Sequence, residues 1–413
     1  MLRRLLAPAL LFPTTLAAQN AATVHRNPAV RTALEQLRTE NEWTLEQQAS
    51  ICAVPAPSFK ELRRAEEFRR RLAALGLRDV RFDSIGNVVA RRPGTGRGPT
   101  VMISGHLDTV FPESIDVRVT REGRVLRGPG IGDDCRGLAV VLAVARAMQR
   151  ANVRTRGDVL FVGTLGEEGE GNLRGVRHIF REGAARPDYF ISVDGTGYGI
   201  TNRAVGSHRY RVTFSGPGGH SHGDFGMPNP VHALGRAIAG IAELQVPETP
   251  KTTFSVGVIH GGTSVNSIAM SATMDVDLRS ESSLQLDSLD ARVRRAIDKA
   301  VADEKARWPG SGAPLEVSLV SLGERPAGAL PDNDPIVLAA LDAARVLGIS
   351  TKLGASSTDA NIGIALGLQA ITIDGGGSSA GTHSLAESYD DSESGWRGPQ
   401  WALLVVARLA GMP

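Results

Sequence analysis

Histidines and carboxylates gather in a few short polar segments that directly follow apolar runs. The residues concerned are His106, Asp108, Glu167, Glu168, Asp194 and His383, and a glycine-rich loop adds the Asp133–Asp134 pair. Any one of them has an ordinary explanation, since acidic residues often cap a following helix and a single His is more often structural. Together they predict a metal site. Imidazole and carboxylate donors without Cys suit Zn²⁺, with Mn²⁺ or Co²⁺ as alternatives.

The number of donors exceeds what one catalytic zinc ion needs. Five ligands are accounted for by two metal ions that share one bridging carboxylate, and such a pair activates a water and stabilises the developing oxyanion. The reaction also requires a base that is not a ligand. The adjacent side chains of Glu167 and Glu168 diverge, so one can bind metal while the other faces the water. The pattern therefore favours metal-assisted hydrolysis.

Strands that alternate with helices must position these side chains. We predict strands at 100–104, 158–165, 189–193 and 370–374, with helices at 61–75 and 138–151. The alternation indicates an α/β domain with a mostly parallel sheet. In such sheets ligands bind outside the carboxyl ends of the strands, which is where the polar segments lie.

The pattern changes near Gly206. The predicted order becomes βαββαβ, the split βαβ or ferredoxin-like arrangement, and the α/β pattern resumes from 334. We therefore divide the chain into a signal peptide (1–18), a catalytic domain in two parts (24–205 and 323–413) and a smaller domain (206–322) inserted between those parts.

Composition excludes several classes of protein. The chain has 413 residues, of which 42% are hydrophobic and 22% charged, as in a soluble globular protein and unlike a disordered one. The formal net charge is only +2 and both signs are interspersed, so we expect no nucleic-acid partner. No apolar stretch has the roughly 18 residues of a membrane span.

The N-terminus has the features of a secretory signal peptide. Arg3 and Arg4 precede an apolar run at 5–16, and small residues such as Ala17 and Ala18 offer cleavage sites. A fraying amphipathic helix is the alternative. We expect a cleaved signal and a secreted or periplasmic protein.

The only two cysteines are Cys52 and Cys135. Export would permit a disulfide between them. Two buried thiols that behave as small hydrophobic side chains fit the sequence equally well, so the pairing stays open.

Five motifs surround the candidate ligands: Ser-Gly-His106-Leu-Asp108-Thr-Val, Gly-Pro-Gly-Ile-Gly-Asp133-Asp134, Gly-Glu167-Glu168-Gly, Val-Asp194-Gly and Gly-Thr-His383-Ser-Leu-Ala-Glu. In this order they resemble the zinc metallopeptidase family that includes peptidase T, carboxypeptidase G, succinyl-diaminopimelate desuccinylase and aminoacylase. The resemblance extends from about residue 45 to the end of the chain and includes the inserted domain.

The resemblance implies a role for each of these residues. His106 and Asp194 would hold one Zn²⁺, Glu168 and His383 would hold the other, and Asp133 would bridge the two ions. Asp108 would fix the ring of His106. Glu167 would act as general base towards water and then as proton donor to the leaving amine. The peptide bond after the bridging Asp is typically cis in this family, so a cis Asp133–Asp134 bond is expected.

By the same resemblance, the inserted domain would serve as a lid and as the contact of a homodimer. His220 resembles the lid histidine that reaches the partner subunit's active site; from the residues alone, a surface-loop His is the alternative. Asn266 and Arg279 match substrate-holding positions. An Arg suits a substrate carboxylate because its fork binds both oxygens, although an exposed strand-end charge is the other reading.

One feature of the chain differs from the family pattern, and another indicates the class of substrate. Cys135-Arg136 stands where many relatives have Lys, so packing beneath the bridge would differ. In the family that the chain resembles, Asp at the position of Asp194 accompanies aminopeptidases and dipeptidases, whereas Glu accompanies carboxypeptidases and deacylases. We therefore predict a secreted di-zinc metallopeptidase that cleaves short peptides as an aminopeptidase or tripeptidase. The alternative is a carboxypeptidase or N-acyl amino acid amidohydrolase. A metal-stabilised protein without catalysis is disfavoured because the ligands and Glu167 are all present.

Overall fold

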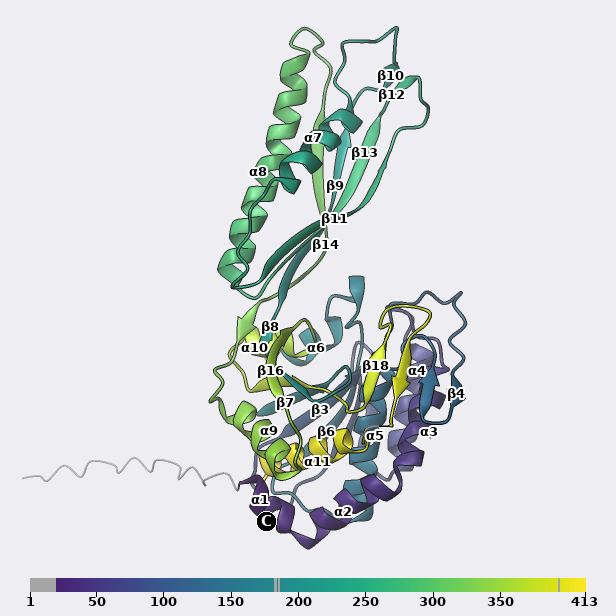
Figure 1. Cartoon of the computed structure of the whole chain (residues 1–413), viewed down its shortest axis with the longest axis vertical. Coiled ribbons are helices and arrows are strands. Elements are labelled where there is room, and N and C mark those ends of the chain that lie inside the picture. The colour runs from purple at the N-terminus through teal and green to yellow at the C-terminus, as the bar shows by residue number, and fades with distance from the viewer. Residues whose placement is uncertain (1–19, 182–183, 185, 393) are drawn as a thin grey trace, which may run out of the picture.

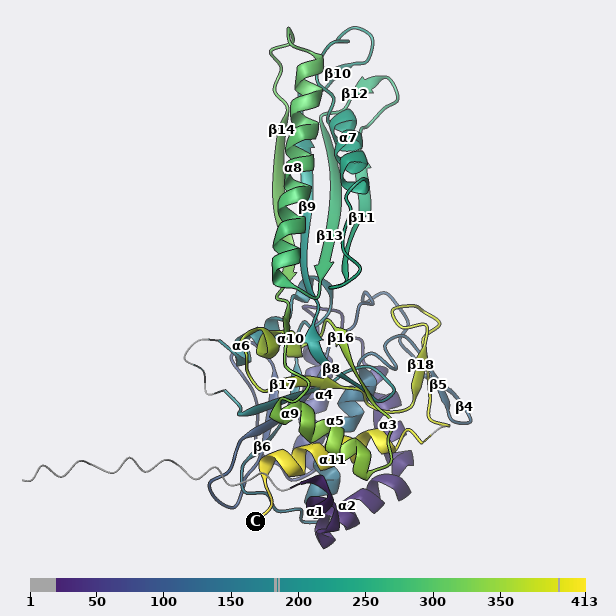
Figure 2. The same ribbon diagram turned by 60° about the vertical axis from the view of Figure 1, so that its left-hand side comes forward.

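The computed structural model describes residues 20–181, 184, 186–392 and 394–413. It consists of a broad lower lobe and an elongated upper lobe that is joined to it by extended strands (Figures 1 and 2). The predicted signal peptide, 1–18, lies outside the described residues. None of the helices in the described ranges is long and apolar enough to cross a membrane.

Among the described residues, nine strands form the central sheet of the lower lobe. Their order is β1 (Arg78–Phe82), β2 (Val88–Arg92), β6 (Val159–Thr164), β3 (Val101–His106), β7 (Tyr189–Val193), β17 (Ala370–Ile373), β8 (Gly199–Ala204) and β15 (Gly328–Ala329), with β16 (Lys352–Ser356) also paired to β8. The middle strands β6, β3, β7 and β17 are parallel to one another, whereas β1, β2 and β15 pair antiparallel at the edges. The predicted α/β class with a mostly parallel sheet is confirmed.

Helix α5 (Cys135–Arg150) is the centre of the lower lobe's core. It packs on β3 and against α2 (Pro28–Thr39), α3 (Asn41–Cys52) and α11 (Arg397–Ala410). Ala, Val and Leu residues occupy most of the surface of this helix, so nearly the whole helix is buried. The lower lobe is completed by α1 (Ala21–Arg26), α4 (Leu62–Ala74), α6 (Arg174–Ile179), α9 (Pro335–Val346), α10 (Ala360–Ala365), and a small sheet of β18 (Ser378–Ala380), β19 (Ser388–Asp390), β5 (Val125–Arg127) and β4 (Thr120–Glu122).

A disulfide joins the two cysteines. Cys52 at the end of α3 and Cys135 at the start of α5 are bonded, with a sequence separation of 83 residues. Of the two possibilities left open by the sequence, the structure has the disulfide.

The upper lobe is an antiparallel sheet covered by two helices. Its strand order is β11 (Thr252–Gly261), β13 (Ser271–Ser280), β9 (Gly206–Ser215) and β14 (Glu316–Arg325), and α7 (Pro230–Ala242) and α8 (Ser283–Arg307) pack on it. Alternate residues of β13 are buried because one face of the sheet meets these helices. The chain order of these elements is the predicted βαββαβ. Strand β14 continues to Arg325, three residues past the boundary we placed at 322, and so returns the chain to the lower lobe.

Candidate active site

The ends of three neighbouring parallel strands carry most of the site. His106 is the last residue of β3, Glu167 and Glu168 follow β6, and Asp194 follows β7. Asp133 lies just before α5 and His383 lies between β18 and β19. The Asp133–Asp134 peptide bond is cis, as expected.

The structure brings all five predicted ligands together around Asp133. The Oδ1 atom of Asp133 lies 2.9 Å from His106 Nε2, and its Oδ2 atom lies 3.0 Å from His383 Nε2. His383 Nε2 is also 2.9 Å from Glu168 Oε1. Potential ligand atoms of His106, Asp133 and Asp194 lie within 4.8 Å of one another, as do those of Asp133, Glu168 and His383. The two sets share Asp133, whose oxygens point in different directions.

The electrostatics of these sets fit divalent cations. Burial and the nearby Asp133 raise the pKa of Asp194 well above its ordinary value. Hydrogen bonds with Asp133 and Glu168 raise the pKa of His383 to about 10. Several carboxylates are thus crowded in a place with little water, which is costly without compensating positive charge. Two divalent ions would supply that charge, and the all nitrogen and oxygen donor set suits them.

The carboxylate of Asp108 contacts more than the His106 ring to which the resemblance assigned it. The Nδ1 atom of His106 lies 3.1 Å from the main-chain oxygen of Asp108 and 3.6 Å from its Oδ1. The carboxylate accepts hydrogen bonds from the main-chain N–H groups of Glu167 and Glu168, both at 2.9 Å, and from Ser58 Oγ at 2.6 Å. The buried Asp108 therefore orients the His106 ring chiefly with its main chain and holds the Glu167–Glu168 turn with its side chain.

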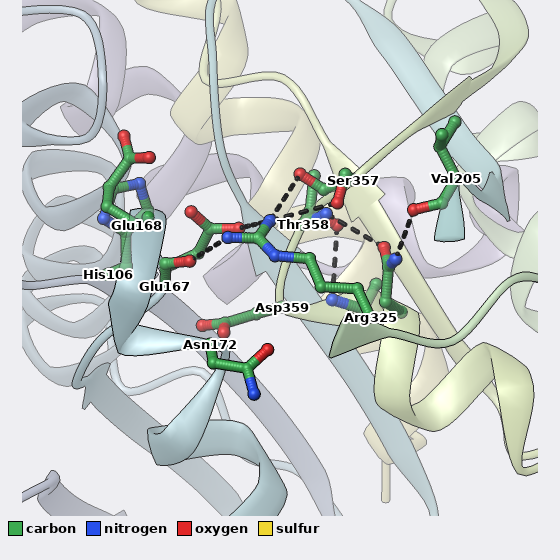
Figure 3. A network of polar contacts seen from close by, with 12 residues as sticks. His106, Glu167, Glu168, Asn172, Val205, Arg325, Ser357, Thr358 and Asp359 are labelled. Carbon is green, nitrogen blue, oxygen red and sulfur yellow. Dashed lines mark hydrogen bonds and ion pairs between the residues drawn. The ribbon is translucent and has the colours of Figure 1, made fainter. Parts of the chain in front are cut away.

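Glu167 is buried beside the ligands and is paired with an arginine. Arg325 Nη1 donates to Glu167 Oε1 at 2.8 Å, and Arg325 Nη2 donates to the main-chain oxygen of Glu167 (Figure 3). The side chains are only 5% and 6% exposed. Burial raises the pKa of Glu167 to about 8; Arg325 opposes this shift and Glu168 adds to it. Such a carboxyl can take and return a proton near neutral pH.

Two residues of the site were missed from the sequence. Arg325, the last residue of β14, also donates to Ser357 Oγ at 3.0 Å. Glu387 accepts hydrogen bonds from the main-chain N–H groups of Gly130, Gly132 and Asp133 at 2.8 to 3.1 Å, and so holds the loop that carries the bridging residue. Glu387 belongs to the His383 motif, which could have indicated it. For Arg325 the only signal was a charged residue where the inserted domain ends.

The Cys135-Arg136 departure has a structural explanation. Arg136 is fully buried beneath the site. Its Nε donates to the oxygen of Gly375 at 2.8 Å and its Nη2 donates to the oxygen of Gly395 at 2.7 Å. Cys135 is the disulfide partner of Cys52. The pair therefore ties the start of α5 to α3 and to two glycine-rich loops.

The predicted substrate residues of the inserted domain are not brought to the ligands of the same chain. His220 lies in β10 (Gly219–His220), which pairs with β12 (Ser267–Ile268) at the outer end of the upper lobe (Figures 1 and 2). Asn266 is beside it, since its main-chain oxygen accepts from the Ser221 N–H at 2.9 Å. Arg279 lies at the other end, near the junction of the lobes, with its Nε 2.8 Å from Asp277 Oδ2.

The fold and the site define a metal-dependent hydrolase that acts on peptide or amide bonds. Residues 102–397 match the model of peptidase family M20/M25/M40, and the chain belongs to this family. It is 30% identical over 255 residues to a succinyl-diaminopimelate desuccinylase of Nitrosospira multiformis, which covers 57% of this chain and 66% of that enzyme.

Solved structures of the family share the fold of this chain. A tripeptidase from Staphylococcus aureus aligns with a TM-score of 0.74 and 21% identity, over 89% of this chain and 98% of that one. A Bacillus subtilis protein described as a dinuclear metal-binding peptidase aligns with a TM-score of 0.63 and 17% identity, over 90% and 98% of the two chains. The resemblance predicted from the five motifs is confirmed, and a metal cofactor is part of it.

Proposed function

We propose that this chain is an exported di-zinc aminopeptidase that hydrolyses short peptides, tripeptides in particular. The observation that carries the proposal is the position of Asp133 between two ligand sets, with Glu167 buried beside both of them. His106 and Asp194 would hold one zinc, Glu168 and His383 the other, and Asp133 would bridge them. Zinc ions there would activate a water and compensate the negative charge that develops on the substrate oxygen.

The chain's own residues perform the proton transfers. Glu167 accepts the proton of the attacking water and then donates it to the leaving amine, a role that suits a carboxyl with a pKa near neutrality. Arg325 keeps its carboxylate in place through two donated hydrogen bonds to the same residue. Asp108 holds the turn on which Glu167 lies.

The choice of an aminopeptidase is supported by Asp194 and by the tripeptidase fold neighbour. The identity to desuccinylases supports the second candidate, an amidohydrolase of N-acyl amino acids or a carboxypeptidase, in which Arg279 would hold a carboxylate. A panel of free tripeptides and N-blocked or N-acylated amino acids separates the two. Cleavage of the blocked substrates alone would refute the aminopeptidase proposal.

Metal content tests the cofactor. Elemental analysis of the mature protein should give two zinc ions per chain, and chelation should abolish hydrolysis until zinc is restored. A protein that retains full activity after complete removal of metal would contradict the mechanism.

We also propose that two copies of the chain form a homodimer through the upper lobe. In such a dimer His220 of one subunit would reach the active site of the other subunit. Its position at the outer end of the upper lobe, away from the ligands of its own chain, supports this role. Subunits carrying His220→Ala, mixed with subunits carrying Glu167→Ala, should recover part of the activity. Subunit exchange without recovery would count against the trans role.

Two features of the chain support its export. The basic and apolar N-terminal segment supports it, and so does the disulfide, because disulfides persist in oxidising compartments. Fractionation of the cells that make the protein, with N-terminal sequencing of the product, should find the chain outside the cytoplasm and cleaved near Ala18. An uncleaved cytoplasmic chain would refute export.

A further inference from the structure

Two large apolar side chains next to the active site are exposed to solvent. Phe59 is 61% exposed and follows Ser58, whose Oγ lies 3.2 Å from the main-chain oxygen of Glu168. Leu385 is 64% exposed and lies two residues beyond the ligand His383. Because His383 Nε2 and Glu168 Oε1 are 2.9 Å apart, both segments border the same ligands. Consecutive Cα atoms are about 3.8 Å apart, so both side chains lie within reach of a short peptide bound there.

The backbone of Phe59 is in a conformation that bulky residues rarely adopt. Its φ is 70°, in the left-handed region where Cβ crowds the following carbonyl. The turn is fixed on one side by Ser58, whose Oγ donates to Asp108 Oδ2 at 2.6 Å. On the other side the Lys60 N–H donates to the main-chain oxygen of Pro57 at 2.8 Å. Glycine would adopt this conformation without strain, so the turn itself does not require an aromatic residue. Strained residues of this kind cluster at functional sites.

The ring of Phe59 is held in place on one face. The guanidinium of Arg174 lies 4.6 Å from the ring centroid, and Arg174 is itself paired with the buried Glu61. Arg174 also packs so closely on Gly166, the residue before Glu167, that a Cβ at Gly166 would clash with it. The ring is therefore fixed near the turn that carries the base, while much of its surface stays open. A preorganised aromatic surface offers a large contact area at a low cost in entropy.

We propose that Phe59 and Leu385 form a specificity subsite for an apolar substrate side chain beside the scissile bond. Contact between such a side chain and the ring removes apolar surface of both from water, which favours binding in proportion to the area buried. The strained turn at Phe59 is retained because its ring selects the substrate. This inference rests on the proposed hydrolysis of peptides or N-acyl amino acids, and it adds two residues to which the family resemblance assigns no role.

Paired substrates test the subsite. The ratio of kcat/KM is measured for Leu-Gly-Gly over Ala-Gly-Gly, in which the side chain lies on the N-terminal side of the scissile bond. It is also measured for N-acetyl-leucine over N-acetyl-alanine, in which the side chain lies on the C-terminal side. The wild type should prefer the leucine member of at least one pair by about tenfold or more, since one methylene in an apolar pocket already changes kcat/KM about that much. Equal rates within both pairs would overturn the subsite, while hydrolysis of the tripeptides would still support the proposed function.

Phe59→Ala and Phe59→Gly form a matched pair of variants. Both lack the ring, so both should reduce the preference for leucine severalfold and to the same extent. They should differ in stability, because glycine adopts a φ of 70° without strain and alanine does not; Phe59→Gly should therefore unfold at the higher urea concentration. Phe59→Tyr keeps an aromatic ring and should retain the preference. A loss of preference that follows stability rather than the absence of the ring would contradict the subsite.

Leu385→Ala should also reduce the preference for leucine, and Leu338→Ala is its control. Leu338 is 45% exposed on α9, outside the site, so the control loses the same surface atoms and should change nothing. Sedimentation should find the same oligomeric state for Phe59→Gly and the wild type. A changed oligomeric state with unchanged selectivity would mean that the exposed ring contacts another chain, and it would overturn the proposal.

Binding without turnover gives a second readout. Calorimetry with the same four compounds and the zinc-loaded Glu167→Ala variant should give the order of affinities that the kinetics give. Adding Phe59→Gly to this variant should reduce the preference for the leucine compound severalfold. Equal affinities within both pairs would overturn the subsite, and this result does not depend on whether the proposed function is correct.

Discussion

Replacing Arg325 with Met removes the guanidinium that is paired with Glu167 and retains most of the apolar volume. The pair is buried, with side chains 5% and 6% exposed, so water cannot replace the lost charge. An opposite charge at this range lowers a carboxyl pKa by about 1–3 pH units. The pKa of Glu167, which burial raises to about 8 even with Arg325 opposing, should therefore rise further in the variant.

The expected loss of activity follows from the ionised fraction of Glu167. The base must be ionised to accept a proton, and below its pKa the ionised fraction falls tenfold for each pH unit. At neutral pH, kcat should consequently fall by about 10- to 1000-fold, and the acidic limb of the profile of kcat against pH should move to higher pH. KM for a neutral tripeptide should change much less, because Arg325 acts through Glu167.

The assay compares kcat and KM against pH for the wild type, Arg325→Met, Arg325→Lys and Arg211→Met. Arg211 pairs with Asp275 on the upper lobe and is half-exposed, so Arg211→Met controls for the loss of an arginine in an ion pair. Millimolar guanidinium should restore part of the activity of Arg325→Met, and Arg325→Lys should retain more activity than Met does. A folded, zinc-loaded Arg325→Met enzyme with the wild-type profile would refute the positioning role.

Three further predictions concern the metal site and stability. Asp133→Ala should lose both metal ions while His383→Ala keeps one, because Asp133 belongs to both ligand sets and His383 to one of them; elemental analysis distinguishes the two variants. Burial raises the pKa of Asp374 from 3.8 to about 6, so the folded state binds this proton more tightly and loses stability as pH rises through that range. Asp374→Asn should therefore have a higher free energy of unfolding than the wild type at about pH 8, by up to about 3 kcal/mol, and no such advantage below about pH 4. Urea unfolding at the two pH values measures the difference, and an equal difference at both would contradict this prediction. The double variant Cys52→Ser/Cys135→Ser, which lacks the disulfide, should have a free energy of unfolding lower by roughly 2–5 kcal/mol, because the bond joins residues 83 positions apart. If the double variant and the wild type unfold at the same midpoint, the disulfide makes no such contribution.

The parts of the site that could be predicted from the sequence are those carried by local motifs. His106 ends one strand, and Glu167 and Asp194 each follow another. Because the carboxyl ends of parallel strands lie at one edge of the sheet, the α/β pattern is enough to predict their convergence. The βαββαβ order of the inserted domain was equally accessible, since the alternation in β13 is regular. Each of these inferences depends on residues close together in the chain.

What could not be predicted depends on long-range packing. Arg325 is 158 residues from Glu167, and no periodicity shows that the last strand of an inserted domain ends against the base. The family resemblance assigned Asp108 to the ring of His106. In the structure, the carboxylate of Asp108 bonds to the turn after β6, because the ends of β3 and β6 are neighbours in the sheet.

The position of Arg325 also connects the two lobes chemically. It is the last residue of β14, a strand of the upper lobe, yet its guanidinium is buried in the lower lobe against Glu167 and Ser357. A rotation of the upper lobe about this junction would move the partner of the base. The pKa of Glu167 and the position of its carboxylate therefore depend on how the upper lobe is placed against the lower one, since Arg325 influences both.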